Sequence, residues 1–292
     1  MQRILTVLSL AFGAALLGSY GGALHPLGDS LAVFRVPLAV FFALPVIWSD
    51  WPRILRWTLT GLAFLAMAQI VAPRLETEDP VVADLRLYQQ NLLFNRQSDA
   101  DWLRAVRDSG ADMLTLQEVS RRNRALLQAL QSDYPTQLFC PFAGVGGVAV
   151  ATRFPAVPGT EICAEGDGLA ALQVQTGQGA VWLVSVHLNW PWPFGQADQI
   201  DRLLPLIEQL DGPVILAGDF NAVGWSHSVA RVARASGTQR AGPQGATFDL
   251  PHIAMPVTID HVLADPGFAV STQVMPKLGS DHHGVLARIA AF

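Results

Sequence analysis

Long apolar runs fill the first quarter of the chain, and only short apolar runs follow. Three of the long runs approach the roughly 20 residues that a helix needs to cross a bilayer: residues 4–24, 31–48 and 54–72. Between Ile4 and Ser49 the only formally charged side chains are Asp29 and Arg35. We therefore predict a membrane anchor over residues 1–73 with three transmembrane helices, and set aside the alternative of buried helices in a soluble domain.

Basic residues predict the orientation of this anchor. Arg3 precedes the first run, and Arg53 and Arg56 lie between the second and third, whereas residues 25–30 contain no Lys or Arg. The positive-inside rule then places the C-terminal part of the chain outside the cytoplasm, at an inner (cell) membrane of bacterial type. The first run could instead be a cleaved signal peptide, and the rest of the chain would still lie outside.

The rest of the chain alternates short strands and helices. A short acidic stretch within residues 74–83 predicts a linker, and residues 84–292 then predict one α/β domain. We expect antiparallel strands within residues 137–152 and 158–174. Helices are predicted over residues 99–109, 121–131, 196–210 and 226–235. From residue 76 onward the chain has 14 Lys and Arg against 22 Asp and Glu, a net charge of −8, which counts against a protein that tracks along DNA.

Polar side chains stand at or near the ends of six predicted strands in this domain. Asp219 and Asn221 follow one apolar strand, and Asp281 and His282 follow another turn near the C-terminus. The remaining four strands contribute Asn91, Glu118, His187 and Asp260. Carboxylates, amides and imidazoles of this kind can hold a divalent metal, activate a water and stabilise a phosphoryl oxyanion. The pattern predicts hydrolysis of a phosphate ester.

In these motifs, and in their order, the chain resembles the endonuclease/exonuclease/phosphatase superfamily. That group includes apurinic endonucleases, pancreatic-type DNases, neutral sphingomyelinases and inositol polyphosphate phosphatases. The resemblance covers about residues 84–292. It implies a four-layer α/β sandwich, in which two packed mixed sheets are flanked by helices and the active site lies at one edge.

The resemblance also implies roles for the polar residues. Asn91, Glu118 and Asp281 would hold the metal, which would be Mg²⁺ or alternatively Mn²⁺. Asp219 would activate the attacking water. His187 would contact the scissile phosphate, and Asn221 would support the transition state. Asp260 would orient His282. Some nuclease members carry a second acid where this chain has Leu93, which favours one metal over two.

Several further residues have two readings. Trp190 and Trp192 follow His187 closely and could stack on bases, dip into lipid headgroups, or pack in the core. Arg121 could contact a phosphate or lie on a solvated helix face. We expect His261 and His283 to be packing or surface residues. Cys140 and Cys163 could form a disulfide or remain two free thiols.

The sequence therefore predicts a membrane-anchored, metal-dependent phosphoester hydrolase. Its substrate would be a nucleic acid or a phospholipid, which gives a nuclease and a lipid or headgroup phosphodiesterase of sphingomyelinase type as alternatives. A non-catalytic binding module on the same scaffold is a third possibility, against which the complete polar set argues. We expect the bilayer as a partner and infer no obligate protein partner.

Overall fold

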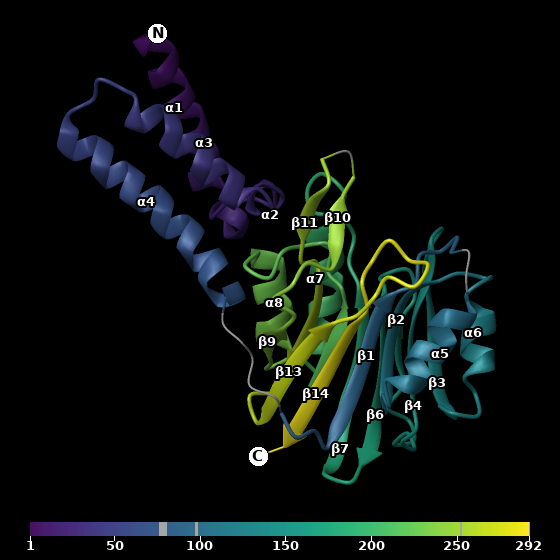
Figure 1. The fold of residues 1–292 in the computed structure, drawn as a ribbon. Coiled ribbons are helices and arrows are strands. Elements are labelled where there is room, and N and C mark those ends of the chain that lie inside the picture. The colour runs from purple at the N-terminus through teal and green to yellow at the C-terminus, as the bar shows by residue number, and fades with distance from the viewer. Residues whose placement is uncertain (76–80, 97–98, 252, 292) are drawn as a thin grey trace.

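A computed structural model describes residues 1–75, 81–96, 99–251 and 253–291. Two six-stranded sheets form the body of the protein, and three long helices project from it (Figure 1). Residues 76–80 of the predicted linker lie outside the described residues.

The first sheet has the strand order β13-β14-β1-β2-β4-β3, in which only β1 and β2 run parallel. Its strands are β1 (Leu85–Asn91), β2 (Met113–Val119), β3 (Thr136–Ala143), β4 (Gly146–Thr152), β13 (Phe268–Val274) and β14 (Val285–Ala291). Because parallel and antiparallel pairs occur together, the sheet is mixed.

The second sheet has the order β5-β6-β7-β8-β12-β9 and is also mixed, because β7 and β8 run parallel. Its strands are β5 (Ile162–Ala164), β6 (Leu169–Thr176), β7 (Gly179–His187), β8 (Val214–Asp219), β9 (Gln239–Gly242) and β12 (Asp260–Ala264). A separate hairpin joins β10 (Phe248–Leu250) to β11 (Met255–Val257).

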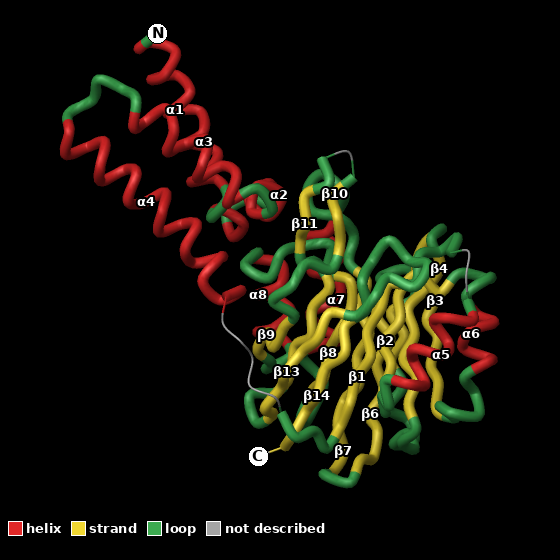
Figure 2. Tube along the Cα trace, in the orientation of Figure 1, coloured by secondary structure: helices red, strands yellow, loops and turns green. Residues whose placement is uncertain are grey.

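Four helices cover the outer faces of the two sheets (Figure 2). They are α5 (Ala100–Asp108), α6 (Arg124–Ala129), α7 (Gln196–Ile207) and α8 (His227–Ala235). Side chains of α5 and α6 pack on the outer face of the first sheet, and those of α7 and α8 pack on the second. A third apolar cluster lies between the sheets. The predicted four-layer α/β sandwich is confirmed.

Alternation along the strands decides which side chains face the space between the sheets. In β1, Leu85 and Leu87 belong to the cluster between the sheets, whereas Tyr88 packs outward toward α5. Successive side chains of a strand point to opposite faces, so Gln89 and Asn91 also point inward. The same rule applies to β8, where Ile215 and Ala217 are followed by Asp219. Polar groups at these strand ends therefore converge on one edge of the inter-sheet core.

The observed helices are shorter than predicted in one place that bears on the site. The helix predicted over residues 121–131 begins only at Arg124, because residues 121–123 form a turn. Within that turn the Asn123 side chain donates to the carbonyl oxygens of Glu118 and Leu93. These residues brace the end of β2 instead of extending the helix.

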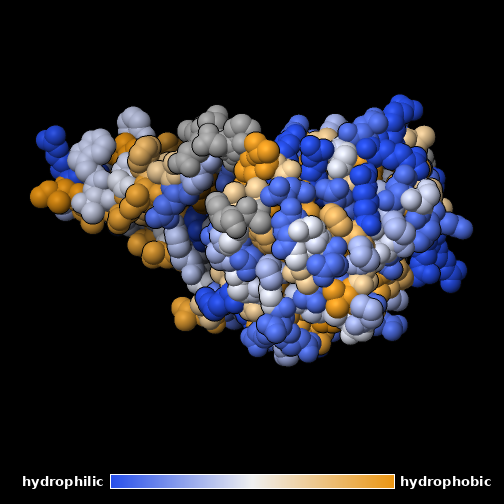
Figure 3. All heavy atoms as spheres, turned by 90° about the horizontal axis from the view of Figure 1, so that it is seen from below, coloured by the Kyte–Doolittle hydropathy of each residue, from blue (hydrophilic) through white to orange (hydrophobic). Residues whose placement is uncertain are grey.

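The N-terminal part folds into helices α1 (Gln2–Gly18), α2 (Leu27–Ala32), α3 (Arg35–Ile47) and α4 (Arg53–Val71). Of these, α4 has the length and apolar composition to cross a membrane, with a mean hydropathy of 1.5 and only 17% of its apolar window buried. Figure 3 shows apolar side chains gathered on this projecting part, whereas the face of the domain in view is mostly hydrophilic.

The helices that fall within the first two predicted spans are shorter than those spans, since α1 and α3 have 17 and 13 residues. The reason is that the chain between α1 and α3 packs against the domain instead of extending either helix. It forms a short 3-10 turn at Gly21–Ala23 and the six-residue helix α2, both of which contact α8.

The two cysteines form a disulfide, which the sequence left open. Cys140 in β3 is joined to Cys163 in β5, with their Cα atoms 5.3 Å apart. Because β3 and β5 are edge strands of different sheets, the bond ties one edge of the sandwich together.

Candidate active site

The register of three neighbouring strands places Asp219 at the centre of the site. On one side, β7 pairs His187 with Asp219, and on the other side β12 pairs Asp260 with Asp219. Asp219 is 1% exposed, and Asp260 is fully buried. Two carboxylates and an imidazole thus meet at the edge of a core that excludes water.

Side chains from three other elements complete the surroundings of Asp219. Its Oδ2 accepts a hydrogen bond from Asn91 Nδ2 at 3.0 Å. The same oxygen lies 3.5 Å from His187 Nε2 and 3.7 Å from His282 Nε2. Its Oδ1 accepts from the backbone N–H of Asn221 at 2.9 Å. The carboxylate is therefore held in one orientation by strands of both sheets.

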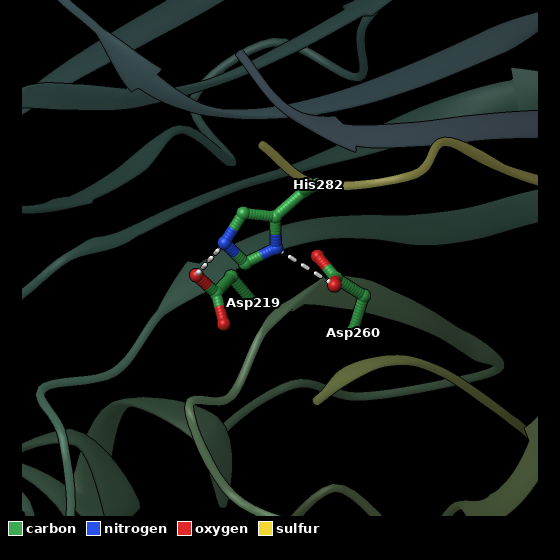
Figure 4. Close-up of side chains that lie close together, drawn as sticks. All are labelled: Asp219, Asp260 and His282. Atoms are coloured by element: carbon green, nitrogen blue, oxygen red, sulfur yellow. Dashed lines mark hydrogen bonds and ion pairs between the residues drawn. The ribbon is translucent and has the colours of Figure 1, made fainter. Parts of the chain in front are cut away.

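His282 lies between two carboxylates, as Figure 4 shows. Its Nδ1 is 2.9 Å from Asp260 Oδ2, while its Nε2 faces Asp219. Burial alone would lower the pKa of His282, but the charges of Asp260 and Asp219 and the hydrogen bond to Asp260 raise it to about 10. The imidazole is consequently a cation at neutral pH.

Burial also moves the pKa values of Asp219 and His187 away from their ordinary values. Burial raises the pKa of Asp219 to about 7, against the attraction of the His282 cation. His282 lies closer to Asp260 than to Asp219, so its charge lowers the pKa of Asp219 too little to offset the effect of burial. Burial and the nearby His282 charge lower the pKa of His187 to about 3, so that ring is neutral. Asp219 is thus poised as a base near neutral pH, next to one neutral and one charged imidazole.

Two site residues have backbone conformations that side chains other than glycine rarely adopt. The φ angles of Glu118 and Asn221 are +52° and +48°. In β2, Leu116 packs outward and Gln117 points inward, so regular alternation would turn Glu118 toward the helices. The left-handed backbone at Glu118, with a register shift beyond Leu116, instead brings its carboxylate to the cleft. Strain of this kind is typical of functional sites.

The oxygen-rich side chains of Glu118, Asp281 and Asn91 fit a hard divalent cation. Glu118 and Asp281 both line the cleft. Burial raises the pKa of Glu118, and the nearby charge of Asp281 raises it further. The Asn91 amide now donates from Nδ2 to Glu118 Oε1 at 3.1 Å, and its Oδ1 accepts from Leu93. To act as a ligand, this amide would have to present its oxygen.

A second group of candidate ligands, Asp219, Asp260 and His282, has atoms within 4.8 Å of one another. Here we favour an internal ion triad over a metal site. Both ring nitrogens of His282 already face carboxylates, Nδ1 at 2.9 Å from Asp260 and Nε2 at 3.7 Å from Asp219.

A cleft of about 430 Å³ opens over these groups. Its walls include Trp190 and Phe142, and the Phe142 ring meets the His187 ring edge-on at 5.2 Å. The Phe248 ring of β10 lies 4.6 Å from the His282 ring. Trp192 is 46% exposed and does not line the cleft, whereas Trp190 and Phe194 do. The function of these aromatics stays a prediction.

Arg121 does not line this cleft. It lies with Arg122 and Arg124 in a neighbouring hollow of about 490 Å³, which shares Phe142 and Ala143 with the cleft. Packing explains the two histidines expected outside the site. His261 is buried between Arg240 and the Ala222 carbonyl, and His283 contacts the Met275 carbonyl.

The model of the "Endonuclease/Exonuclease/phosphatase family" matches residues 88–282, a range that includes Asn91, Glu118, His187, Asp219, Asp260, Asp281 and His282. The chain belongs to this family. No curated protein sequence matches it as a relative.

Solved structures share the fold of this family member at low sequence identity. A beta toxin mutant from Staphylococcus aureus with bound magnesium ions has a TM-score of 0.55 at 14% identity, covering 70% of this chain and 99% of that one. Sphingomyelinase C from Streptomyces griseocarneus has a TM-score of 0.51 at 18% identity, with coverages of 70% and 98%. The endonuclease domain of the retrotransposon TRAS1 has a TM-score of 0.51 at 17% identity, with the same coverages.

Sequence reasoning missed a buried network of amides beside the candidate site residues. Gln89 Nε2 donates to Asp260 Oδ1 at 2.9 Å and to Gln117 Oε1 at 2.8 Å. Gln117 in turn donates to Ser185 Oγ across the two sheets at 3.0 Å. The available signal was an amide at an inward position of an otherwise apolar strand, which requires a partner when buried.

The ion triad predicts how stability depends on pH. The pKa of His282 is raised in the folded protein, so its contribution is complete below about 6.5, the unfolded value, and is lost as the pH rises to about 10. In metal-free buffer, the free energy of unfolding should fall between pH 7 and pH 10 by an amount on the order of a few kcal/mol. Denaturant titrations at several pH values measure this fall.

The matched variant is His282→Gln, which cannot titrate in this range. Its stability should be lower at pH 7, because Asp219 and Asp260 are left buried without their cation. Equal stability of the two proteins at pH 7 would show that His282 is not held as a cation.

Proposed function

We propose that this chain is a membrane-anchored, divalent-metal-dependent phosphodiesterase with its active site outside the cytoplasm. The observation that carries the proposal is the buried carboxylate of Asp219, placed beside a neutral and a charged imidazole at the base of a cleft. Its pKa of about 7 suits a general base at neutral pH. Family membership supports phosphoester hydrolysis as the reaction class.

In the proposed reaction, Asp219 removes a proton from a water molecule in the cleft. The water oxygen forms a bond to phosphorus, the bond between phosphorus and the leaving alcohol oxygen breaks, and that oxygen takes a proton from solvent. The His282 cation and the amide of Asn221 stabilise the negative charge that develops on the phosphoryl oxygens. Neutral His187, 3.5 Å from Asp219, donates a hydrogen bond to the phosphate.

Glu118 and Asp281, with the Asn91 amide, would hold the metal. When bound there, a divalent ion supplies positive charge to a phosphate oxygen. Oxygen ligands favour Mg²⁺, and Mn²⁺ accepts the same set. The magnesium ions in the similar beta toxin structure support this choice.

Four features support the membrane anchor and its orientation. The sides of α4 are mostly exposed and apolar, which suits lipid. Arg3 and Arg53 stand at the helix ends far from the domain, where the positive-inside rule expects the cytoplasm (Figure 1). Trp48 and Trp57 are exposed at that same end, as in an interfacial belt. The Cys140–Cys163 disulfide agrees with an oxidising compartment.

A nuclease remains the second candidate. The hollow lined by Arg121 and Arg122 adjoins the cleft and could take a neighbouring phosphate of a nucleic acid. The similar fold of the TRAS1 endonuclease domain is compatible with this reading. The net charge of −8 over residues 76–292 opposes it, because nucleic-acid binders are usually basic.

Removing the proposed base tests the assignment of Asp219. Asp219→Asn should fold normally and lose activity on bis(p-nitrophenyl) phosphate by roughly 10²–10⁴-fold, the range for a positioned general base. Asp198→Asn, at an exposed position of α7, is the control and should keep full activity. Near-normal turnover by folded Asp219→Asn would remove Asp219 from the mechanism.

Neutralising the proposed metal ligand tests the second assignment. Glu118→Gln should raise the Mg²⁺ concentration needed for half-maximal activity by roughly ten- to hundredfold or more, because a ligand loses its charge. Glu208→Gln, at an exposed site after α7, should leave the metal dependence unchanged. Full activity in excess chelator would contradict a metal mechanism.

The orientation of the chain can be measured with fusions. A reporter after Phe292 that works only outside the cytoplasm should be active, because Arg3 and Arg53 are expected inside. The same reporter placed between α3 and α4 should be inactive. The opposite pair of results would place the catalytic domain in the cytoplasm.

A further inference from the structure

The segment that connects α1 to α3, residues 19–34, is packed against the catalytic domain. It contains the 3-10 turn Gly21–Ala23 and helix α2. Figure 1 shows α2 beside the β10–β11 hairpin, at the end of the anchor that faces the domain. We call residues 19–34 the docking segment.

A buried carboxylate attaches the docking segment to α8. Asp29 is only 4% exposed. Its Oδ1 accepts from the backbone N–H of His227 at 2.7 Å, and its Oδ2 accepts from the N–H and hydroxyl of Ser228 at 2.9 and 2.6 Å. The first N–H groups of a helix have no partner within it and carry partial positive charge. Asp29 therefore serves as the anionic partner of α8, although nearly two hundred residues separate them.

Two glycines permit this close approach. A Cβ atom at Gly22 would lie 2.4 Å from Asp29 Oδ1 and 2.7 Å from His227 Cβ. A Cβ atom at Gly28 would lie 2.3 Å from the backbone nitrogen of Gly22. Since a real side chain cannot approach so closely, the docking segment and α8 fit together in a single arrangement.

Further contacts connect the docking segment to the wall of the cleft. Ser30 Oγ donates to the Trp192 carbonyl at 2.6 Å, and Trp225 Nε1 donates to the Ala32 carbonyl at 2.9 Å. Val33 packs against a small core that contains Phe248 and Trp190. Trp190 lines the cleft, and Phe248 contacts the His282 ring. The anchor is thus joined to the cleft wall, not tethered through a linker alone.

Exposed apolar side chains continue from the docking segment to the rim of the cleft. They are Leu24, Leu27, Phe34, Trp192 and Phe194, with exposed fractions from 38% to 92%. Phe194 also lines the cleft. Because this segment directly follows α1 and precedes α3, these side chains stand where the apolar helices leave the bilayer. Aromatic and aliphatic side chains at that level suit the lipid headgroup region.

We propose that the docking segment locks the catalytic domain onto the bilayer, with its cleft at headgroup level, so that the substrate is a phosphodiester lipid of the same membrane. This inference rests on the proposed function, since it names the substrate of that same site. A rigid attachment at this height gives the cleft a high effective concentration of lipid phosphate and hinders access by a long soluble polyanion.

The test separates docking from chemistry by changing Asp29. The full-length protein is placed in vesicles of phosphatidylethanolamine and phosphatidylglycerol with Mg²⁺. Two rates are measured: release of the phosphorylated headgroup or alcohol from the vesicle lipids, and hydrolysis of bis(p-nitrophenyl) phosphate. Asp29→Asn removes the charge with little change in size. Asp50→Asn, an exposed acid at the opposite end of the anchor, is the matched control.

We expect the wild type to hydrolyse both substrates. Asp29→Asn should keep the rate on the soluble ester and lose roughly tenfold or more on vesicle lipid, because the site is no longer held at the surface. Asp50→Asn should match the wild type on both. Amide hydrogen exchange verifies undocking, since His227 and Ser228 should lose protection in Asp29→Asn while β7 and β8 keep theirs.

Other outcomes overturn distinct statements. If Asp29→Asn loses protection at α8 yet hydrolyses lipid normally, docking does not serve catalysis. If it loses the soluble ester as well, the segment is part of the catalytic fold and not a docking element. If the wild type cleaves the soluble ester and single-stranded DNA but no lipid, the substrate class is wrong and the proposed function stands. If it cleaves no ester at all, the proposed function itself fails.

Discussion

Two buried carboxylates share one imidazolium at the edge of the core between the sheets, and the rest of the site depends on this arrangement. Removing charges from water is costly unless they are paired and hydrogen-bonded. Asp260 meets that requirement through His282 and Gln89. Asp219 meets it only in part, because His282 lies 3.7 Å away, and burial therefore raises its pKa to about 7. The same desolvation that threatens stability makes Asp219 a base that works near neutral pH.

Support for this triad comes from both sheets. The amide chain from Gln89 through Gln117 to Ser185 crosses the inter-sheet space, where apolar side chains fill the neighbouring positions. A wholly apolar layer would pack as well but could not hold Asp260 in position. On the other side of the cleft, Asn123 and Ser120 brace the backbone around Glu118 through bonds to its carbonyl and to that of Phe94. That bracing offsets the cost of the left-handed conformation at Glu118.

The N-terminal helices and the catalytic domain form one mechanical unit through a single buried acid. Asp29 satisfies N–H groups of α8 that would otherwise lack partners, and α8 packs on the outer face of the sheet that carries Asp219. An attachment of this kind fixes the height and the orientation of the domain relative to the N-terminal helices, whereas a flexible linker would fix only their proximity. In the proposed arrangement, the exposed side chains of Trp192 and Phe194 face the lipid headgroups, which accounts for their apolar character.

The layered fold and the set of polar site residues can be predicted from the sequence alone. Apolar strands of period two alternating with helices require packed sheets with helices outside, and polar residues at inward positions of strand ends must converge, as Asn91, His187 and Asp219 do. The order of the motifs along the chain then indicated the family. These inferences rest on the local periodicity of apolar and polar residues, which can be read in full from one sequence.

Features that depend on partners far apart along the chain became visible only in the folded structure. The outward alternation of β2 would have turned Glu118 away from the cleft, and only its left-handed backbone brings it in. The sequence left open whether Arg121 contacts a phosphate or lies on a solvated face, and the turn before α6 carries it into the hollow that adjoins the cleft. The disulfide between Cys140 and Cys163 required the two sheet edges to meet. The role of Asp29 depends on contacts with α8, and so does the shortening of the apolar helices. Local sequence cannot encode such contacts, because the partners are far apart along the chain.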